Sequence, residues 1–522
     1  MWSELQERHW YVLPALSGAL LVLAFYPYNF WPLIFVALAP LFYFAAVSPE
    51  RPLRKVFYGG CIAGGMLALS LSLNVVLDFK WTADQYFFIT AVRLSFVLLA
   101  AIGGIACGLA LTVYRLLRSR YALLNGLLAA SAYAATEMLL YRLYGEHNFA
   151  LLAYTVTPLP VLMVFAWAGG IFLVSFIIAW GNAVLAEAWL RWYARPAMGA
   201  GAILSFALGI VLLGTALGTL NRPATPVGKI SLAIIQLGDT ANKRNLIGKE
   251  REGIFMLPAL ESTLEEAAKG APDLLLYPFS PTRAALYDGK PPSLGYDVSF
   301  AHKATVAAWF ALRVPASTTV MIWTAYFNAP VFYDELEFFQ DGKPVMAYQK
   351  RELSPFLNYT PAWARALGMR TTIFDAQSGA KDQRVTAAGA PAAAAICSEI
   401  YAQDIVRADA ARSSYLISVG TESIVGNAAR VFSLKAAQFR AAENNIPVIR
   451  ANILGPSAII DRKGSVTAFA PSEKETVLRG TLEVTEPAVT PFSRLGNTPL
   501  IAGICFIFAA AMLQRRIAAG NV

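Results

Sequence analysis

Residues 392–400 read AAAAICSEI, and this stretch decides how the second half of the chain folds. A short run of small and apolar residues is typical of a buried strand, and a helix is expected to begin just after it. Cys397 then lies at the carboxyl end of the strand, where its thiol is exposed and backbone N–H groups can stabilise an oxyanion. Because a thiolate is a competent acyl acceptor and leaving group, the stretch predicts a nucleophile at Cys397.

Strands and helices alternate on both sides of this stretch. Residues 331–339 and 343–353 form an expected hairpin around Asp341-Gly342, a strong turn signal. Lys350 lies on the second of these strands, and a lysine near the thiol would lower the pKa of the thiol and stabilise an oxyanion. Further strands are expected at 229–237, 272–278, 318–327 and 415–421, and helices at 245–270, 299–314 and 432–445. This alternation predicts an α/β sandwich.

The first half of the chain is far more apolar. Of the 522 residues of the whole chain, 57% are hydrophobic and 15% are charged. In soluble domains about 25% of the residues are charged. A membrane-crossing helix needs roughly 20 apolar residues, and candidate spans occur at 10–26, 30–47, 57–78, 86–113, 122–141, 159–188, 198–220 and 498–514. We therefore expect a membrane domain of about seven helices over 1–220, a soluble domain over 221–497, and a C-terminal transmembrane helix with a tail over 498–522.

Basic residues in the short loops predict the orientation. With the N-terminus in the cytoplasm, the inside segments hold eleven Lys and Arg, and the short outside loops hold only Lys80 and Arg142. The positive-inside rule then places both termini in the cytoplasm and residues 221–497 outside it. Many basic residues thus lie in short loops, where they orient helices. The sequence contains no basic stripe with interleaved aromatic residues, so nucleic acid binding is not expected.

The cysteines, the histidines and one intramembrane arginine limit the kinds of site that the chain can contain. Cys397 is the only cysteine between residues 221 and 497, so no disulfide is expected within that domain. The chain has three histidines, too few for the usual zinc sites, and neither a metal nor a cofactor is expected. Arg93 lies inside a long apolar run, and because intramembrane charge is costly it is a candidate for binding a lipid headgroup.

Several long segments resemble the nitrilase (carbon–nitrogen hydrolase) superfamily, and within it the apolipoprotein N-acyltransferase family. YQKRELSPFLNYTP (348–361) resembles the family segment Tyr-x-Lys-x-x-Leu-x-Pro-Phe-Gly-Glu-Tyr-x-Pro, and AAICSEI resembles its Ile-Cys-Tyr-Glu nucleophile segment. Residues 23–41, 439–464 and 490–497 resemble further family motifs. The resemblance spans roughly residues 15–510.

The resemblance implies a four-layer αββα sandwich joined to membrane helices in the bacterial inner membrane. It implies that a cysteine takes an acyl chain from a phospholipid as a thioester and passes it to the α-amine of a lipoprotein. Cys397 matches the nucleophile, Lys350 the oxyanion-stabilising lysine, and Glu399 the glutamate two residues beyond the cysteine. Ser398 replaces the usual tyrosine between them.

The chain departs from the family pattern where the general base should be. The segment LYPFSPT puts Phe279 at the position of the catalytic glutamate. Asn358, which is followed by Tyr359, stands where the family has a second glutamate in a loop. The usual Asn-Asp-x-Trp stretch is GTES (420–423), which introduces Glu422. Glu422 and Glu399 are therefore the candidates for a substitute base, and Phe279, Ser398, Asn358, Tyr359 and Arg93 are the candidates for substrate binding.

Three functions remain open from the sequence. The protein retains acyl transfer to an amine with a rewired base, or it is a catalytically inactive paralogue that binds lipid or lipopeptide, or it catalyses a related amide or ester reaction. The altered site is similar to that of family members associated with conjugal transfer, which implies a role in assembling a cell-envelope or conjugal-transfer apparatus. The expected partners are phospholipid and a lipoprotein or small secreted protein.

Overall fold

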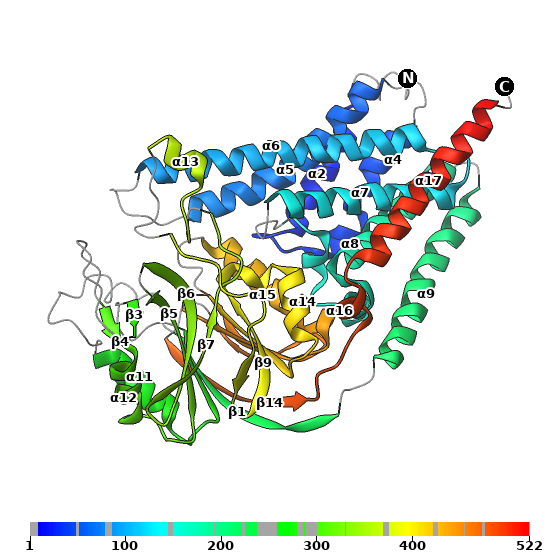
Figure 1. Cartoon of the computed structure of the whole chain (residues 1–522). Helices are drawn as coiled ribbons and strands as arrows, with labels where there is room; N and C mark the ends of the chain where they lie inside the picture. The colour runs from blue at the N-terminus through cyan, green and yellow to red at the C-terminus, as the bar shows by residue number, and fades with distance from the viewer. Residues whose placement is uncertain are drawn as a thin grey trace. The chain divides into compact units, whose positions relative to one another are not determined.

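The chain divides into two compact units in the computed structural model. The helical unit comprises Met1–Arg222, Val425–Lys435 and Arg494–Val522, and the α/β unit comprises Pro223–Ile424 and Ala436–Ser493. The structure describes residues 9–47, 52–78, 86–144, 150–192, 195–221, 225–236, 258–278, 285–288, 300–328, 330–355, 357–368, 375–420, 426–453, 455–471 and 475–520. Figure 1 shows the helices and strands of both units with their labels.

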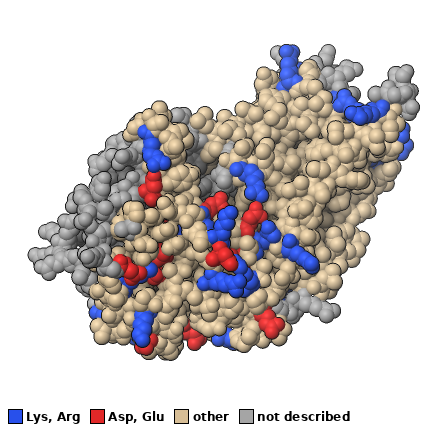
Figure 2. Space-filling model, viewed as in Figure 1, with Lys and Arg blue, Asp and Glu red and all other residues tan. Residues whose placement is uncertain are grey.

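Long apolar helices make up the helical unit. They are α2 (Val12–Ala24), η1 (Trp31–Leu33), α3 (Ile34–Ala37), α4 (Ala39–Val47), α5 (Leu53–Asp78), α6 (Tyr86–Leu117), α7 (Ala122–Tyr144), η4 (Leu152–Val156), α8 (Pro160–Arg191), α9 (Pro196–Leu220) and α17 (Thr498–Gly520). Among the described residues six helices are long and apolar enough to cross a membrane, and two further apolar stretches are shorter. The visible surface of α9 and α17 is almost free of charged side chains along their length (Figure 2). The expected multi-pass helical class is thus confirmed.

Small residues allow a close contact between α5 and α6 of this unit. A Cβ added to Gly60 of α5 would lie 2.6 Å from the Cα of Gly108 on α6, and one added to Gly64 would lie 2.5 Å from the Cβ of Cys107. Without a hydrophobic driving force between helices in lipid, such close backbone approach is what stabilises their packing.

The buried side chain of Asn182 is hydrogen-bonded to backbone groups within the helical unit. Asn182 of α8 accepts hydrogen bonds from the N–H groups of Leu38 and Ala39 at 2.8 and 3.1 Å, and it donates to the carbonyl of Ile34 at 2.8 Å. It thereby provides hydrogen-bond partners for backbone groups at the junction between α3 and α4. Helix α8 itself is interrupted at Gly169 and Gly170, whose φ angles are −151° and 77°. The predicted single span over 159–188 is therefore two helical segments.

Two sheets form the centre of the α/β unit. The first has the order β14-β1-β2-β5-β3-β4, with β6 paired to β5 and β7, and the second has the order β13-β12-β11-β10-β9-β8. The first sheet's strands are β1 (Pro226–Gln236), β2 (Leu274–Tyr277), β3 (Ala285–Tyr287), β4 (Phe300–His302), β5 (Thr319–Asn328), β6 (Val331–Gln340), β7 (Lys343–Gln349) and β14 (Thr476–Thr485). The second sheet's strands are β8 (Val385–Ala387), β9 (Ala390–Ile396), β10 (Tyr415–Gly420), β11 (Val448–Asn452), β12 (Ser457–Ile460) and β13 (Val466–Ala470).

Helices cover the outer faces of both sheets. The helices and helical turns are α11 (Pro258–Ala268), α12 (Lys303–Ala311), α13 (Ala362–Ala366), η5 (Cys397–Ile400), α14 (Gln403–Ala410), α15 (Gly426–Asn444) and α16 (Pro491–Leu495). One apolar core joins α11 and α12 to the first sheet, and a second lies between the two sheets. Helix α14 and the C-terminal part of α15 lie on the other face of the second sheet (Figure 1). This arrangement confirms the expected αββα layers.

Two local predictions have different outcomes. The hairpin around Asp341-Gly342 is confirmed, and both turn residues have positive φ, 48° and 67°, as a two-residue hairpin turn requires. The prediction of one helix over 299–314 is wrong at its start, because Phe300–His302 form strand β4. The His302 side chain then caps α12 by accepting a hydrogen bond from the N–H of Ala304 at 3.2 Å.

Candidate active site

Cys397 stands at the end of a buried strand, as the sequence predicts. Strand β9 ends at Ile396, and the 3-10 turn η5 begins with Cys397 itself. The φ of Cys397 is 54°, in the left-handed region that residues other than glycine seldom adopt. Because β9 and β10 are parallel and pair up to Ile396 and Val419, the thiol lies where two strands end together. Residues held in such backbone conformations cluster at active sites.

Glu399 fixes this turn against the segment that carries Lys350. One carboxylate oxygen accepts hydrogen bonds from the N–H groups of Arg351 and Glu352 at 2.7 and 3.2 Å. The other accepts from the N–H of Ile396 at 2.9 Å and from the hydroxyl of Tyr348 at 3.1 Å. Burial is the largest influence on the pKa of Glu399 and raises it, while these N–H groups and the charge of Lys350 act against that rise. The side chain is therefore occupied in holding the two segments together.

Ser398 makes a second tie between the same segments. Its hydroxyl lies 2.6 Å from that of Ser354, and both side chains are buried. Ser398, predicted to bind substrate, is thus packed against the loop that follows Lys350. Tyr359, predicted for the same role, is half-buried and forms an isolated bridge with Pro355.

Lys350 lies just beyond β7 and is buried beside an amide and a carboxylate. Its Nζ donates to Oδ1 of Asn358 at 2.9 Å and lies 4.0 Å from Oδ2 of Asp334. Asn358 in turn donates from Nδ2 to Oδ2 of Asp334 at 3.0 Å. The indole N–H of Trp323 donates to the other oxygen of Asp334. Asp334 is thus a carboxylate beside Lys350 that the sequence reasoning missed.

The backbone register explains why Asp334 faces Lys350. The N–H of Lys350 donates to the carbonyl of Asp334 at 2.8 Å, which continues the β6–β7 ladder by one step. The ladder shifts register between Phe338 and Phe339. A count back from the Asp341-Gly342 turn without this shift pairs Lys350 with Tyr333, so only knowledge of the irregularity could have identified Asp334.

A second lysine with carboxylates lies on the opposite face of β6. Lys303 of α12 places Nζ 3.2 Å from Glu335 and 2.5 Å from Glu337, and 3.8 Å from Asp288. The same nitrogen lies 3.8 Å from the ring centroid of Tyr326. Successive side chains on a strand point to opposite faces, so Glu335 and Glu337 face away from Asp334.

Three of the predicted site residues cannot be placed. Phe279 and Glu422 lie outside the described residues, and Arg93 belongs to α6 but its side chain is not described. Among the residues that are described, no group of three or more His, Cys, Asp or Glu could hold a metal ion. The described site therefore consists of a strained cysteine, a buried lysine and two acidic residues with different surroundings.

Comparisons with known proteins show what the chain is similar to. Residues 17–184 match the apolipoprotein N-acyltransferase N-terminal domain, and residues 259–487 match the carbon–nitrogen hydrolase family. The apolipoprotein N-acyltransferase of Caulobacter vibrioides is 24% identical over 100% of this chain and 97% of its own length, and that of Azotobacter vinelandii is 25% identical over 97% and 95%. A solved CN-hydrolase superfamily protein from Xanthomonas campestris is 17% identical over 49% of this chain and 91% of its own, with a TM-score of 0.35.

Proposed function

The chain belongs to the apolipoprotein N-acyltransferase family of the nitrilase superfamily, and on this premise we propose that it transfers an acyl chain from a phospholipid to an amine. The intermediate is a thioester on Cys397, and the acceptor is the α-amine of a lipoprotein or of a small secreted protein. The observation that carries the proposal is the turn at Cys397, held in a left-handed conformation and tied by Glu399 to the segment of Lys350.

The reaction proceeds in two balanced steps. In the first, the sulfur of Cys397 attacks the ester carbonyl carbon, a C–S bond forms, and the C–O bond to the glycerol breaks. The proton lost by the thiol ends on the hydroxyl of the departing lysophospholipid. In the second, the acceptor amine attacks the thioester, a C–N bond forms, and the C–S bond breaks. A proton from the amine returns to the sulfur, so the enzyme is regenerated.

Lys350 supplies the positive charge for both steps. A buried cation aimed at a developing oxyanion stabilises it far more than an exposed one would, because water does not screen it. Asp334 and Asn358 hold the ammonium group in place. In this family two glutamates supply negative charge to the site, and in this chain their positions hold Phe279 and Asn358. We assign that role to the carboxylate of Asp334.

Glu399 and Asp334 are expected to act differently. The two oxygens of Glu399 already accept four hydrogen bonds, three of them from backbone N–H groups. We therefore assign it a positioning role, holding the Cys397 turn. Asp334 is the described carboxylate best placed to exchange a proton near Lys350, and Glu422, which lies outside the described residues, is the other candidate.

The proposed location is the bacterial inner membrane, with both termini in the cytoplasm and the α/β unit outside it. Support comes from one end of the helical unit. Arg118 at the end of α6 forms an ion pair with Glu187 near the end of α8 at 2.7 Å, and Arg515 of α17 donates to the carbonyl of Leu116. Helix α2 also begins at the end where α17 finishes (Figure 1). Such a concentration of arginine is typical of the cytoplasmic side.

The first test is formation of the acyl-thioester. Purified full-length protein is incubated with a phospholipid carrying an alkyne-tagged acyl chain, and the hydroxylamine-sensitive label is measured. We expect labelling that Cys397→Ser abolishes. Cys505→Ser, which removes an exposed thiol of α17, serves as the matched control and retains the label. Labelling that survives in Cys397→Ser rules out the proposed nucleophile.

The second candidate is a catalytically inactive paralogue that binds lipid or lipopeptide and serves a cell-envelope or conjugal-transfer apparatus. It is favoured by the amide of Asn358 standing where the family has a glutamate. It predicts a folded protein that retains phospholipid and never forms the thioester. A labelled Cys397 excludes this candidate.

A further inference from the structure

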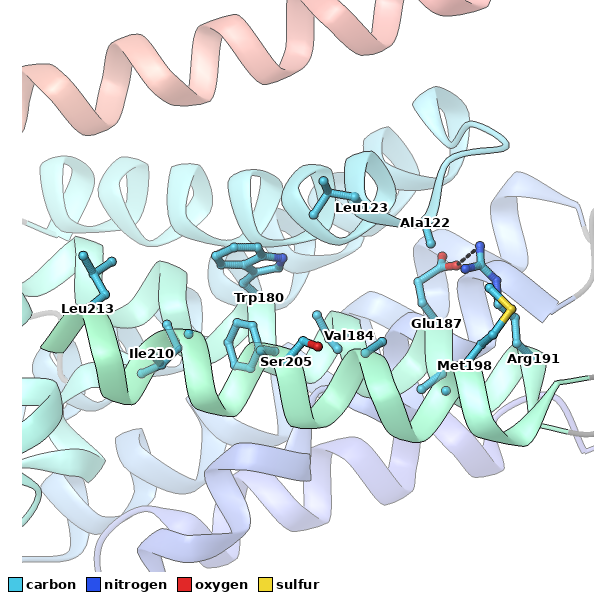
Figure 3. A pocket seen from close by; sticks show the side chains of 15 residues that line it. Ala122, Leu123, Trp180, Val184, Glu187, Arg191, Met198, Ser205, Ile210 and Leu213 are labelled. Atoms are coloured by element: carbon cyan, nitrogen blue, oxygen red, sulfur yellow. Dashed lines mark ion pairs between the residues drawn. The ribbon is translucent and has the colours of Figure 1, made fainter. Parts of the chain in front are cut away.

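A cavity of about 580 Å³ lies between α7, α8 and α9 of the helical unit (Figure 3). Its volume falls within the range of roughly 300–1,000 Å³ that is usual for ligand sites. Apolar side chains form the walls along most of its length, namely Leu123 of α7, Trp180 and Val184 of α8, and Phe206, Ile210 and Leu213 of α9.

The cavity exists because α9 presents small residues to α8. Near its start the two helices are close, since a Cβ added to Gly199 would lie 3.2 Å from the carbonyl oxygen of Ala188. At Gly209, two to three turns further along, an added Cβ would meet nothing within 4 Å. Between these points Phe206 contacts the edge of Trp180, with ring centroids 5.1 Å apart. The result is an elongated apolar space, suited to a flexible chain.

One end of the cavity carries charge. Glu187 accepts a hydrogen bond from Arg118 at 2.7 Å and from Asn125 at 3.3 Å, and Arg191 lies 3.5 Å from its other oxygen. Two guanidinium groups thus share one carboxylate, which leaves an excess positive charge. The side chain of Arg191 is 41% exposed and lines the cavity, so the excess charge is available to an anion.

Aromatic side chains mark the same end. Trp189 and Trp192, on either side of Arg191, are both exposed. Tryptophan is enriched at the boundary between the hydrocarbon core and the headgroups, where its ring is half in each environment. An apolar space that runs into the hydrocarbon from a cationic, tryptophan-flanked end has the pattern of charge and polarity of a phospholipid.

We propose that this cavity binds a phospholipid of the surrounding bilayer, with one acyl chain along α9 and the phosphate against Arg191. A free anion would leave the apolar length unfilled, and a diacylglycerol would leave the excess positive charge of Arg118 and Arg191 without an anion. The residues that line it belong to the helical unit, and we assign them no part in the thioester chemistry. It binds lipid whether or not the proposed acyl transfer occurs.

The test uses photo-crosslinking to the full-length protein. A phosphatidylglycerol with a diazirine on its acyl chain is added in nanodiscs, irradiated, and the modified peptides are identified by mass spectrometry. We expect crosslinks on α8 and α9 facing the cavity. Gly209→Leu should lower their yield about tenfold by filling the space. Gly201→Leu is the matched control, because it also meets nothing within 4 Å but does not line the cavity.

A second arm tests the headgroup. Arg191→Gln should lower crosslinking of the phospholipid severalfold and leave that of a diazirine-diacylglycerol with the same chain unchanged. Arg120→Gln, an arginine outside the cavity that contacts Tyr121, is the control. Cys397→Ser should crosslink like the natural sequence, which separates this proposal from that of acyl transfer. Equal yields in Gly209→Leu, or crosslinks spread evenly over all apolar helices, would overturn it and indicate bulk lipid only.

Discussion

Strand β6 carries two lysine–carboxylate clusters on its opposite faces, and they differ in how closely carboxylates approach the ammonium group. On one face Lys303 has Glu335 and Glu337 within 3.2 Å and Asp288 at 3.8 Å. On the other face Lys350 has an amide at 2.9 Å and a carboxylate only at 4.0 Å. In the first cluster three carboxylates surround one ammonium group, which holds Lys303 within the fold. In the second, the ammonium group of Lys350 lies beside an amide and one carboxylate at 4.0 Å, and we propose that it also stabilises negative charge that arises during the reaction.

The largest effect on stability is expected at the Lys303 cluster. Lys303→Met leaves two buried glutamates without their cation, and breaking a buried ion pair typically costs about 3–5 kcal/mol. Thermal unfolding should show a clear fall in Tm. Lys343→Met, at an exposed lysine of β7, provides the control and should leave Tm unchanged. An unchanged Tm in Lys303→Met would mean that the cluster is not a stabilising unit.

The largest effect on activity is expected at the Lys350 cluster. Lys350→Met should slow thioester formation by about 10²–10³-fold, the usual cost of removing one oxyanion-stabilising group. Its Tm should fall less than that of Lys303→Met, because the carboxylate of Asp334 lies farther from the ammonium group of Lys350, at 4.0 Å. The rate and the Tm are compared by measuring initial rates of label incorporation and thermal unfolding curves on the same preparations of each variant. A variant that labels at the natural rate would remove Lys350 from the mechanism.

Asp334→Asn should have a smaller effect on rate. Hydrogen bonds to charged groups contribute about 1.5–3 kcal/mol, so we expect a rate lower by roughly tenfold to a hundredfold at saturating phospholipid. Binding of phospholipid should not change, and Asp334→Glu should restore part of the rate. Asp341→Asn in the hairpin turn is the control. Weaker lipid binding at an unchanged maximal rate would contradict the role assigned to Asp334.

The Lys303 cluster also predicts a dependence of stability on pH. Burial, and then the charge of Glu335, raises the pKa of Glu337 from 4.5 to about 8. A carboxyl with a raised pKa binds its proton more tightly in the folded state, so stability should fall as pH rises from 4.5 to about 8. Tm measured across this range should fall less in Glu337→Gln than in the natural sequence. Glu265→Gln, at an exposed position on α11, should retain the natural slope.

The smallest effect concerns the pair Ser398 and Ser354. Ser398→Ala leaves one buried hydroxyl without its partner and should cost about 1 kcal/mol of stability. The double variant Ser398→Ala with Ser354→Ala should recover part of this loss, because neither hydroxyl is then left unpaired. Unfolding curves of the two single variants and the double variant measure the coupling. Strictly additive losses would show that the 2.6 Å contact does not couple the two side chains.

Most of the fold could be predicted because its signals are local. Apolar runs locate the membrane helices to within a few residues, and the Asp341-Gly342 turn sets the hairpin. The interruption of α8 was missed because a Gly-Gly pair inside an apolar run does not itself disclose a break. Strand β4 was missed because Phe300–His302 continue into a helix whose cap, the ring of His302, is recognisable only once the backbone is known.

Site residues that lie on one segment of sequence could be predicted. Those that are brought together by the register between two strands could not. Cys397 and Glu399 share a turn, so one stretch of sequence reveals both. Asp334 reaches Lys350 across a ladder whose register shifts at Phe338, and no pattern in the sequence marks that shift. The carboxylate that could replace the missing glutamates was therefore found only in three dimensions.

The left-handed backbone of Cys397 has a consequence for how this position changes over evolutionary time. A side chain in that conformation costs about 1–2 kcal/mol, and a glycine would avoid this cost. Selection for stability alone therefore favours drift toward glycine, and only a use for the thiol opposes it. In descendants of this chain that no longer use the thiol, we expect the cysteine at this position to be replaced by glycine or asparagine.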